Sequence, residues 1–325
     1  MVKIGVLGAG HLGKIHLKLL KQIPEFEVVG FYDPNPELAA KVENELGIKR
    51  FPLMDLLLDK VEAVDIVTPT LSHYECAINA IKRGRHIFIE KPMTNTVEEA
   101  RKLLSFVDEA NIKAQVGHVE RFNPAFLAIA DTQLSPMFIE THRLAQFNPR
   151  GTDVSVILDL MVHDIDLILS IVKANVKKIS ASGVAIISKS PDIANARIEF
   201  DNGCVANITA SRISVKQMRK MRMFQKDAYI SMDFLEKKTQ IFKLNTNINE
   251  QENLAFAIDT ADKEKLYLNF EEPEIKPVNA IKMELELFAQ CIINDTDPPV
   301  TVVDGYNAIL VAHQILKKVE KTSLV

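Results

Sequence analysis

The chain has 325 residues, of which 47% are hydrophobic and 25% charged, as in a globular protein large enough for two domains. Its net charge of −4 disfavours nucleic-acid binding as the main function, because such proteins carry an excess of Lys and Arg. The chain opens with a strand rather than a signal peptide, no apolar run approaches the roughly 20 residues that span a bilayer, and its three cysteines form no C-x-x-C motif, so we expect a cytoplasmic protein.

Residues 3–33 carry a dinucleotide-binding pattern. A short apolar strand leads into a glycine-rich turn, an apolar-periodic helix and a second strand that ends at Asp33. The first glycine of the turn permits a tight bend, the second lets a pyrophosphate approach the backbone, and the third lets helix and strand pack closely. The helix start offers free N–H groups to the phosphates. We therefore expect cofactor contacts at Gly8, Gly10, His11, Leu12 and Gly13.

Asp33 follows the last glycine by 20 positions, where an acid accepts hydrogen bonds from the adenosine ribose hydroxyls. Its negative charge would repel a 2′-phosphate, so NAD is expected and NADP is disfavoured. An ordinary glycine-rich turn is the alternative, and the presence of strand, helix and acid in register argues against it.

Strands and helices continue to alternate up to about residue 121. We expect helices over 36–47, 51–58, 74–83 and 96–111, and strands over 63–67, 86–89 and 114–117. Alternating elements with apolar strands predict a doubly wound parallel sheet, so residues 1–121 are expected to form an NAD-binding domain. Ligands of such sheets bind beyond the carboxyl ends of the strands. The candidates there are Thr68, Pro69, Thr70, His73, Glu90 and Lys91.

Residues 122–325 have a different pattern, and we expect an α+β domain with one broad, mostly antiparallel sheet that binds substrate and forms oligomers. A helix over 155–172 should cover one sheet face, and the other can meet a second copy in a homodimer or homotetramer. Residues 245–252 are too polar to assign. The expected elements are helices over 122–132, 155–172, 280–294 and 305–317, and strands over 137–143, 176–185, 194–200, 204–211, 217–225 and 228–234; the last helices can pack back on the first domain.

Lys91, in the sequence Glu90-Lys91-Pro92, follows a strand at the position where a nicotinamide ring would lie. There it can hold a substrate hydroxyl and help to move its proton. Position alone leaves a solvated loop lysine open as the alternative.

Asp159, His163 and Asp166 are spaced by four and three residues, which places them on one face of the expected helix 155–172. A histidine is a natural proton acceptor near neutral pH, and a carboxylate one turn away can orient it. Metal ligation is one alternative, although the chain has no cysteine cluster and no H-E-x-x-H motif. Satisfaction by neighbouring backbone is the other.

Several basic residues lie between these motifs and are suited to phosphate or carboxylate recognition. Each can instead be an ordinary surface residue. Arg150 and Arg212 are the better candidates, because each lies in or beside an expected loop at a cleft edge. The full set is His118, Arg121, Arg143, Arg150 and Arg212.

Taken in chain order, these motifs resemble the Gfo/Idh/MocA oxidoreductase family over nearly the whole chain. The resemblance implies a Rossmann domain, an α/β domain whose open sheet makes dimer or tetramer contacts, and NAD(P) in the cleft. It identifies Lys91 with the family's cofactor-contacting lysine, and Asp159 and His163 with its D-x-x-x-H pair, in which the histidine is the candidate base. No metal is implied.

A narrower resemblance is to the branch that acts on UDP-N-acetylglucosamine and related UDP-sugars. It rests on residues 117–124, 150–154, 159–166 and 209–212. It implies oxidation of the sugar 3-hydroxyl, with a dehydrogenase of a free sugar or inositol-like polyol as the alternative. A non-catalytic NAD-dependent sensor would have no need for Lys91 and His163 together. The expected substrate contacts are Lys91, His118, Arg121, Asn123, Arg150, Asp153, His163 and Arg212.

Overall fold

The structure is a computed structural model that describes residues 1–148, 154–245, 254–259 and 265–322. It divides into two compact units, which we call unit 1 (residues 1–119 and 279–310) and unit 2 (residues 120–278 and 311–325). The assignment of NAD binding to residues 1–121, and of substrate binding and association to residues 122–325, remains a prediction.

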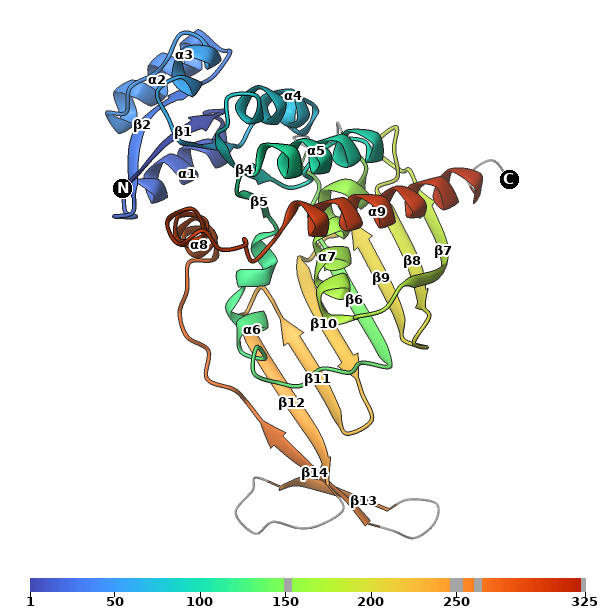
Figure 1. The fold of residues 1–325 in the computed structure, drawn as a ribbon. Coiled ribbons are helices and arrows are strands. Elements are labelled where there is room, and N and C mark those ends of the chain that lie inside the picture. The colour runs from blue at the N-terminus through green and yellow to red at the C-terminus, as the bar shows by residue number, and fades with distance from the viewer. Residues whose placement is uncertain (149–153, 246–253, 260–264, 323–325) are drawn as a thin grey trace. The chain divides into compact units, whose positions relative to one another are not determined.

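The described residues of unit 1 form a five-stranded parallel sheet in the order β2-β1-β3-β4-β5 (Figure 1). The expected doubly wound parallel sheet is therefore confirmed. Its strands are β1 (Val2–Leu7), β2 (Phe26–Tyr32), β3 (Ala63–Ile66), β4 (His86–Glu90) and β5 (Ala114–Gly117). Its helices are α1 (His11–Leu20), α2 (Pro36–Leu46), α3 (Met54–Leu58), α4 (Thr70–Ile81), α5 (Val97–Ala110), α8 (Ala280–Asn294) and the first turns of α9 (Val302–Thr322).

Helices cover both faces of this sheet. Ile4 and Val6 of β1 share a buried core with residues of α1 and α8. Gly5 lies between them in sequence, and a Cβ atom there would meet Leu57 of α3 at 2.8 Å. Because successive residues of a strand face opposite sides, α1 and α8 lie on one face and α3 lies on the other.

Local capping signals fix where the helices of unit 1 begin and end. The Asn35 side chain accepts two backbone N–H groups at the start of α2, and α2 ends at Gly47, whose φ is 62°. Thr96 and Glu99 form a capping box at the start of α5. These caps confirm the predicted signals, and each is worth about 1 kcal/mol of helix stability.

The described residues of unit 2 form a nine-stranded sheet in the order β13-β14-β12-β11-β10-β6-β9-β8-β7 (Figure 1). Strands β6 and β9 pair in parallel, and the other described pairs are antiparallel, so the predicted mostly antiparallel sheet is confirmed. The strands are β6 (Phe138–Leu144), β7 (Val176–Val184), β8 (Ile193–Phe200), β9 (Val205–Ser211), β10 (Met218–Phe224), β11 (Ala228–Asp233), β12 (Lys238–Asn245), β13 (Leu254–Asp259) and β14 (Lys265–Glu271).

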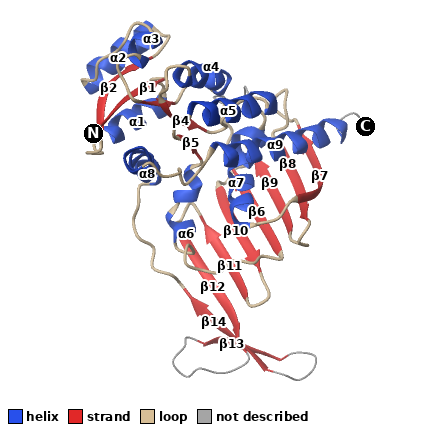
Figure 2. Ribbon diagram, in the orientation of Figure 1, coloured by secondary structure: helices blue, strands red, loops and turns tan. Residues whose placement is uncertain are grey.

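The helical segments of unit 2 are η1 (Val119–Phe122, begun by the last residue of the first segment of unit 1), α6 (Pro124–Leu127), η2 (Ile157–Met161), α7 (Val162–Ile171) and the end of α9. Helix α7 packs on β6 and β9, and α6 packs on β11 and β12 (Figure 2). The expected helix over one sheet face is thus present. Among the described helices of the whole chain, none combines the length and apolar character needed to cross a membrane.

Several predicted helices differ from the structure. The helix expected over 122–132 is α-helical only at Pro124–Leu127, the one expected over 74–83 spans Thr70–Ile81, and the one expected over 305–317 spans Val302–Thr322. The helix expected over 51–58 begins only at Met54, because Pro52 disfavours helical geometry in the residue before it. The helix expected over 155–172 is π-helical at Ile157–Met161 and α-helical only from Val162. Residues four positions apart stay on nearly the same face when one turn is π-helical. The spacing of Asp159 and His163 therefore could not distinguish the two kinds of turn.

Strands β12, β13 and β14 were not predicted. Residues 238–245 mix lysine, threonine and asparagine with apolar residues, and their pairing partners lie up to about 30 positions away in β14. Strand β12 also pairs with β11 through the short turn 234–237, whose sequence Phe-Leu-Glu-Lys contains no Gly, Pro or Asn to mark it. Of the unassigned stretch 245–252, residues 246–252 lie outside the described residues.

Candidate functional site

The glycine-rich turn after β1 has the shape that a phosphate-binding turn requires. Gly8 has a φ of 97°, and a Cβ atom there would lie 2.7 Å from the Val67 carbonyl oxygen. A Cβ atom on Gly13 would overlap the Gly8 carbonyl oxygen. Gly10 has open space within 4 Å of its Cβ position. Glycine is thus needed at the first and third positions, and the second leaves the backbone accessible to a ligand.

Helix α1 begins directly after this turn. Among the described residues no side chain caps α1 at Gly10, so the first N–H groups are available to an anion. His11 is exposed and Leu12 is partly exposed. The predicted contacts at Gly10, His11 and Leu12 are therefore at the surface of unit 1, whereas Gly8 and Gly13 are buried.

Asp33, the predicted ribose-binding acid, follows β2 and is partly exposed. Its Oδ2 accepts the Ala9 N–H at 2.7 Å, and its Oδ1 accepts the Asn35 N–H at 2.9 Å. These two bonds hold the carboxylate beside the glycine-rich turn. Each oxygen can accept a further hydrogen bond, so binding of ribose hydroxyls is compatible with this arrangement.

His73 of α4 lies between two loops that follow β3 and β4. Its Nε2 is 2.8 Å from the Thr68 carbonyl oxygen, its Nδ1 is 2.9 Å from the Pro92 carbonyl oxygen, and the residue is only 1% exposed. Burial lowers the pKa of His73, although both carbonyls oppose this effect. His73 thus connects the two loops through these contacts. Thr68, Pro69 and Thr70 lie at the surface.

Glu90 and Lys91 lie at the carboxyl end of β4. Glu90 is 7% exposed, and its Oε2 accepts the Lys91 backbone N–H at 3.1 Å. Lys91 is partly exposed, and the Lys91–Pro92 peptide is cis. Because all five strands are parallel, Lys91 lies at the same edge of the sheet as Gly8 and Asp33.

Asp159 and His163 of unit 2 stand out within a largely buried helix. Asp159 lies in the π-helical turn, and His163 lies in the first turn of α7. Both are partly exposed, while Asp166 is only 1% exposed. π-Helical turns are frequent at functional sites. In the described part of the chain no three His, Cys, Asp or Glu side chains gather as they would around a metal ion.

Two carboxylates of α7 are bound by arginines within unit 2. The Arg121 guanidinium binds Asp166 through two hydrogen bonds of 2.6 and 2.8 Å. Arg143 of β6 binds Asp164 through two bonds of 2.9 Å, and its Nη1 donates to Glu120 at 2.7 Å. Burial opposes ionisation of Glu120, but Arg143 lowers its pKa. These pairs fix α7, and therefore His163, relative to the sheet.

The remaining predicted substrate residues differ in their burial and in their hydrogen bonds to the rest of the protein. Asn123 caps α6 and also donates to Glu120 Oε2 and to the Phe234 carbonyl oxygen. His118, which belongs to unit 1, is 2% exposed. Arg212 is 4% exposed, and its Nη2 donates to the Val154 carbonyl oxygen at 2.7 Å. Arg150 and Asp153 lie outside the described residues.

Sequence reasoning singled out neither Glu120 nor Asp164 as a binding partner of Arg143. Their only signal was an acidic residue in a buried, apolar segment, and each pairs with an arginine at least 21 positions away. His16, Asp65 and Glu284 of unit 1 were missed for the same reason; they are buried polar residues from separate elements.

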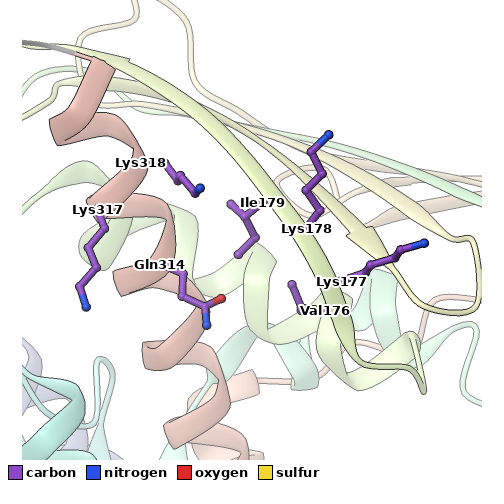
Figure 3. Close-up of a pocket in the computed structure, with 7 residues that line it drawn as sticks. All are labelled: Val176, Lys177, Lys178, Ile179, Gln314, Lys317 and Lys318. Atoms are coloured by element: carbon purple, nitrogen blue, oxygen red, sulfur yellow. The ribbon is translucent and has the colours of Figure 1, made fainter.

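A pocket of about 350 Å³ lies between β7 and the end of α9 in unit 2 (Figure 3). It contains none of the predicted site residues. Four lysines line it, but their side chains point in different directions rather than toward one point (Figure 3). The lining residues are Val176, Lys177, Lys178, Ile179, Gln314, Lys317 and Lys318.

Family models match most of the chain. Residues 2–118 match the oxidoreductase family with an NAD-binding Rossmann fold, GFO_IDH_MocA. Residues 136–230 match the GFO/IDH/MocA C-terminal domain. Each match falls mainly within one of the two structural units.

Individual relatives are named as sugar or polyol dehydrogenases. UDP-N-acetylglucosamine 3-dehydrogenase of Acidithiobacillus ferrooxidans is 40% identical over 242 residues, which cover 74% of this chain and 77% of that protein. Its solved structure, GnnA, matches with a TM-score of 0.88 and 34% identity over 98% of both chains. The NAD(+)-dependent scyllo-inositol 2-dehydrogenase of Bacillus subtilis is 31% identical over 66% of this chain and 68% of that protein.

A more distant solved structure shares the fold. Scyllo-inositol dehydrogenase of Lactobacillus casei, solved with NAD(H) and scyllo-inositol, matches with a TM-score of 0.78 and 19% identity over 99% of this chain and 98% of that one. Together with the glycine-rich turn, the parallel sheet and the large antiparallel sheet, these matches show that the chain belongs to the Gfo/Idh/MocA family of NAD-binding oxidoreductases.

Proposed function

We propose that this oxidoreductase is an NAD-dependent dehydrogenase that oxidises the 3-hydroxyl of a UDP-N-acetylhexosamine to a ketone. The observation that carries the proposal is the likeness to UDP-N-acetylglucosamine 3-dehydrogenase, at 34% identity over 98% of both chains. The sequence features shared with the UDP-sugar branch, including residues 117–124 and 159–166, support the same substrate class.

The cofactor proposal rests on the fit of the strand-end edge of unit 1. Open space at Gly10 and the uncapped start of α1 suit a pyrophosphate. Asp33, held by the Ala9 and Asn35 N–H groups, suits ribose hydroxyls and disfavours a 2′-phosphate. We therefore propose NAD rather than NADP. When bound, its nicotinamide ring supplies the hydride acceptor.

The chemical proposal assigns separate tasks to three side chains. His163 accepts the proton of the substrate hydroxyl while the carbon that bears this hydroxyl loses a hydride. Asp159, on the preceding turn, orients the imidazole and favours its protonated form. Lys91 donates a hydrogen bond to the same hydroxyl oxygen and stabilises the charge that develops there. General-base help of this kind accelerates a reaction by roughly 10²–10⁴.

Association with a second copy through the sheet of unit 2 is also proposed. Five aromatic side chains form a row across β6, β10, β11, β12 and β14, with neighbouring ring centroids 4.8–6.0 Å apart. Their neighbours along the strands, such as Ile139 and Met223, are buried, so the row lies on the face opposite α7. Phe224 is 40% exposed. The row consists of Phe138, Phe224, Tyr229, Phe242 and Phe270.

Such a row on the sheet face opposite α7 is typical of an interface between identical chains.

A cytoplasmic location is proposed as well, and it is supported by the three free cysteines of the chain.

The test of the proposed function is a substrate panel. Purified protein is incubated with NAD and UDP-N-acetylglucosamine, UDP-N-acetylgalactosamine, free N-acetylglucosamine or inositols, and NADH absorbance is followed. A 2-oxo acid is added in a parallel series to reoxidise NADH that stays bound. We expect turnover with a UDP-sugar and a product that has lost two hydrogens. Turnover only with sugars that lack the nucleotide would contradict the substrate assignment.

The second candidate is a polyol dehydrogenase, which the 31% identity to scyllo-inositol 2-dehydrogenase favours. It predicts turnover with inositols in the same panel, and activity that does not depend on a UDP group. The two candidates share the cofactor and the proposed roles of Lys91 and His163.

A further inference from the structure

Unit 1 contains a cluster of buried titratable side chains beneath the strand-end edge. His16 of α1, Asp65 of β3 and Glu284 of α8 are 0% exposed, and Glu90 of β4 is 7% exposed. Charged and polar groups are rarely buried unless they are paired or functional. The proposed roles of Lys91 and His163 leave this cluster unexplained.

His16 lies between two of the carboxylates. Its Nδ1 is 2.9 Å from Asp65 Oδ2, and its Nε2 is 3.4 Å from Glu90 Oε1. Only the Nδ1 contact has hydrogen-bond geometry, and the Nε2 contact with Glu90 is electrostatic. The imidazolium form is the one that attracts both carboxylates. Burial opposes that form, but Asp65 and Glu90 raise the pKa of His16 well above its usual value. The pKa of Glu90 is lowered, because His16 and Lys91 outweigh the effect of its burial.

Glu90 transmits this contact to the proposed catalytic segment. Its second oxygen, Oε2, accepts the Lys91 backbone N–H at 3.1 Å. A Cβ atom on Gly117 would lie 2.9 Å from Oε1, the oxygen that faces His16, and 3.1 Å from Cδ. The Glu90 carboxylate therefore fills a closely fitted space and links the His16 ring to the Lys91 backbone.

Glu284 balances the charge of the cluster. Burial, followed by repulsion from Glu90, raises its pKa well above the usual value and favours its neutral carboxyl form. The His16 ring then faces the carboxyl groups of Asp65 and Glu90, with Lys91 nearby. Burial raises the pKa of Asp65, and the charge of His16 opposes this effect. Replacing His16 with a neutral residue would leave those two carboxylates buried without the cation between them.

We propose that His16 is a positioning residue for the dehydrogenase reaction, which acts through the Glu90 carboxylate to hold Lys91 in place against substrate. This inference rests on the proposed catalytic role of Lys91. It gives the cluster a function that packing alone would not require, because apolar side chains could fill the same space. A small displacement of a catalytic group can cost about 10²-fold in rate.

The test compares His16→Gln with His86→Gln. His86 begins β4, at the end of that strand opposite Glu90, and its ring accepts the Lys113 N–H outside the cluster. We expect H16Q to lower kcat by roughly 10- to 100-fold, while KM for the sugar and Kd for NADH change by less than about threefold. H86Q should keep kcat within about twofold of wild type.

The pH dependence of kcat supplies a readout that a structural role would not change. The titratable groups around Glu90 are His16, Asp65, His73, Lys91 and Glu284. Without the His16 cation, burial raises the pKa of Glu90, and the Lys91 N–H loses its ionised acceptor as the pH falls. We expect H16Q, but not H86Q, to show a new loss of kcat on the acid side. Parallel pH profiles for H16Q and wild type would overturn the proposal.

Three further variants complete the test. If His16 acts through Glu90, H16Q combined with Glu90→Gln should be no slower than Glu90→Gln alone; multiplied effects would overturn the proposal. Should H16Q fail to fold, Gly117→Ala displaces the Glu90 carboxylate directly and should reproduce the loss of kcat. Wild-type turnover by that variant would also contradict the proposal.

Assays of the wild-type protein distinguish failure of the proposed function from failure of the His16 proposal. If wild type reduces NAD with none of the sugars, the dehydrogenase proposal fails first. The protonation of His16 is then still measured by NMR of histidine-labelled protein, with H16Q used to assign its signal. We expect the pKa of His16 to lie well above its usual value in wild type and to fall in Asp65→Asn. A neutral ring near neutral pH would refute the charge arrangement.

Discussion

Replacement of Arg143 by methionine tests how the predicted catalytic helix is held in unit 2. The guanidinium is 3% exposed and binds Asp164 at 2.9 Å and Glu120 at 2.7 Å, and both carboxylates are almost fully buried. Removing one partner of a buried ion pair costs about 3–5 kcal/mol, because the other charge stays buried and unpaired. Arg219, 3.4 Å from Glu120 and 48% exposed, remains close to it. We therefore expect Arg143→Met to lower the free energy of unfolding by about 3–5 kcal/mol at neutral pH.

The matched control is Arg222→Met, which removes an ion pair of the same kind from the neighbouring strand. Arg222 binds Glu140, but their side chains are 44% and 30% exposed. Exposed pairs are worth about 0–1 kcal/mol, so this variant should unfold almost as wild type does. Urea unfolding followed by circular dichroism measures both variants. In thermal unfolding, Arg143→Met should lower Tm by about 6–20 °C.

The pH dependence of the Arg143→Met effect has a definite sign. In wild type the lowered pKa of Glu120 contributes stability above its unfolded pKa, and this is lost as pH falls through the folded value. Burial already raises the pKa of Asp164 in wild type, although Arg143 opposes this effect. Without Arg143, the folded pKa values of Asp164 and Glu120 both rise and lie above the unfolded values, so further stability is lost as pH rises through them. The destabilisation should be smaller at about pH 5.5 than at about pH 8. A loss below about 1 kcal/mol, or an equal loss at both pH values, would refute this reasoning.

Three further predictions follow from the site and the sheet. His163→Ala should lower kcat by about 10²–10⁴-fold with little change in NADH affinity measured by fluorescence; unchanged turnover would remove His163 from its proposed role. Asp33→Ser should weaken NAD binding about 10- to 100-fold and narrow the preference for NAD over NADP, as measured by titration with both cofactors; an unchanged preference would contradict the ribose assignment. Tyr229→Glu, in the middle of the aromatic row, should shift the chain to a smaller species in sedimentation velocity without loss of circular dichroism, whereas an unchanged sedimentation coefficient would rule out this face as the interface.

Much of unit 1 could be predicted because its signals are local. Gly8, Gly13 and Asn35 each answer a requirement of backbone geometry or capping that is set by their immediate neighbours. The same is true of the capping box at Thr96. The position of Lys91 at the carboxyl end of a strand also followed from the alternation of elements.

What could not be predicted depends on contacts between distant residues. His16 reads in sequence as a polar residue on a helix, and its partner Asp65 lies 49 positions away. Asp166, which was expected to share a face with Asp159 and His163, binds Arg121, 45 positions away, and this pairing was not predicted. The π-helical turn at Ile157–Met161 likewise has no sequence signature distinct from an α-helix.

The central claim, oxidation of a UDP-sugar at its 3-hydroxyl, is tested most directly with UDP-N-acetylglucosamine that carries deuterium at C3 of the sugar. If the account is right, the deuterium appears in the reduced cofactor, and turnover is slowed by an isotope effect wherever hydride transfer limits the rate. Reduced cofactor that contains no deuterium, formed while the sugar is consumed, would show that hydride leaves another carbon and would contradict the claim.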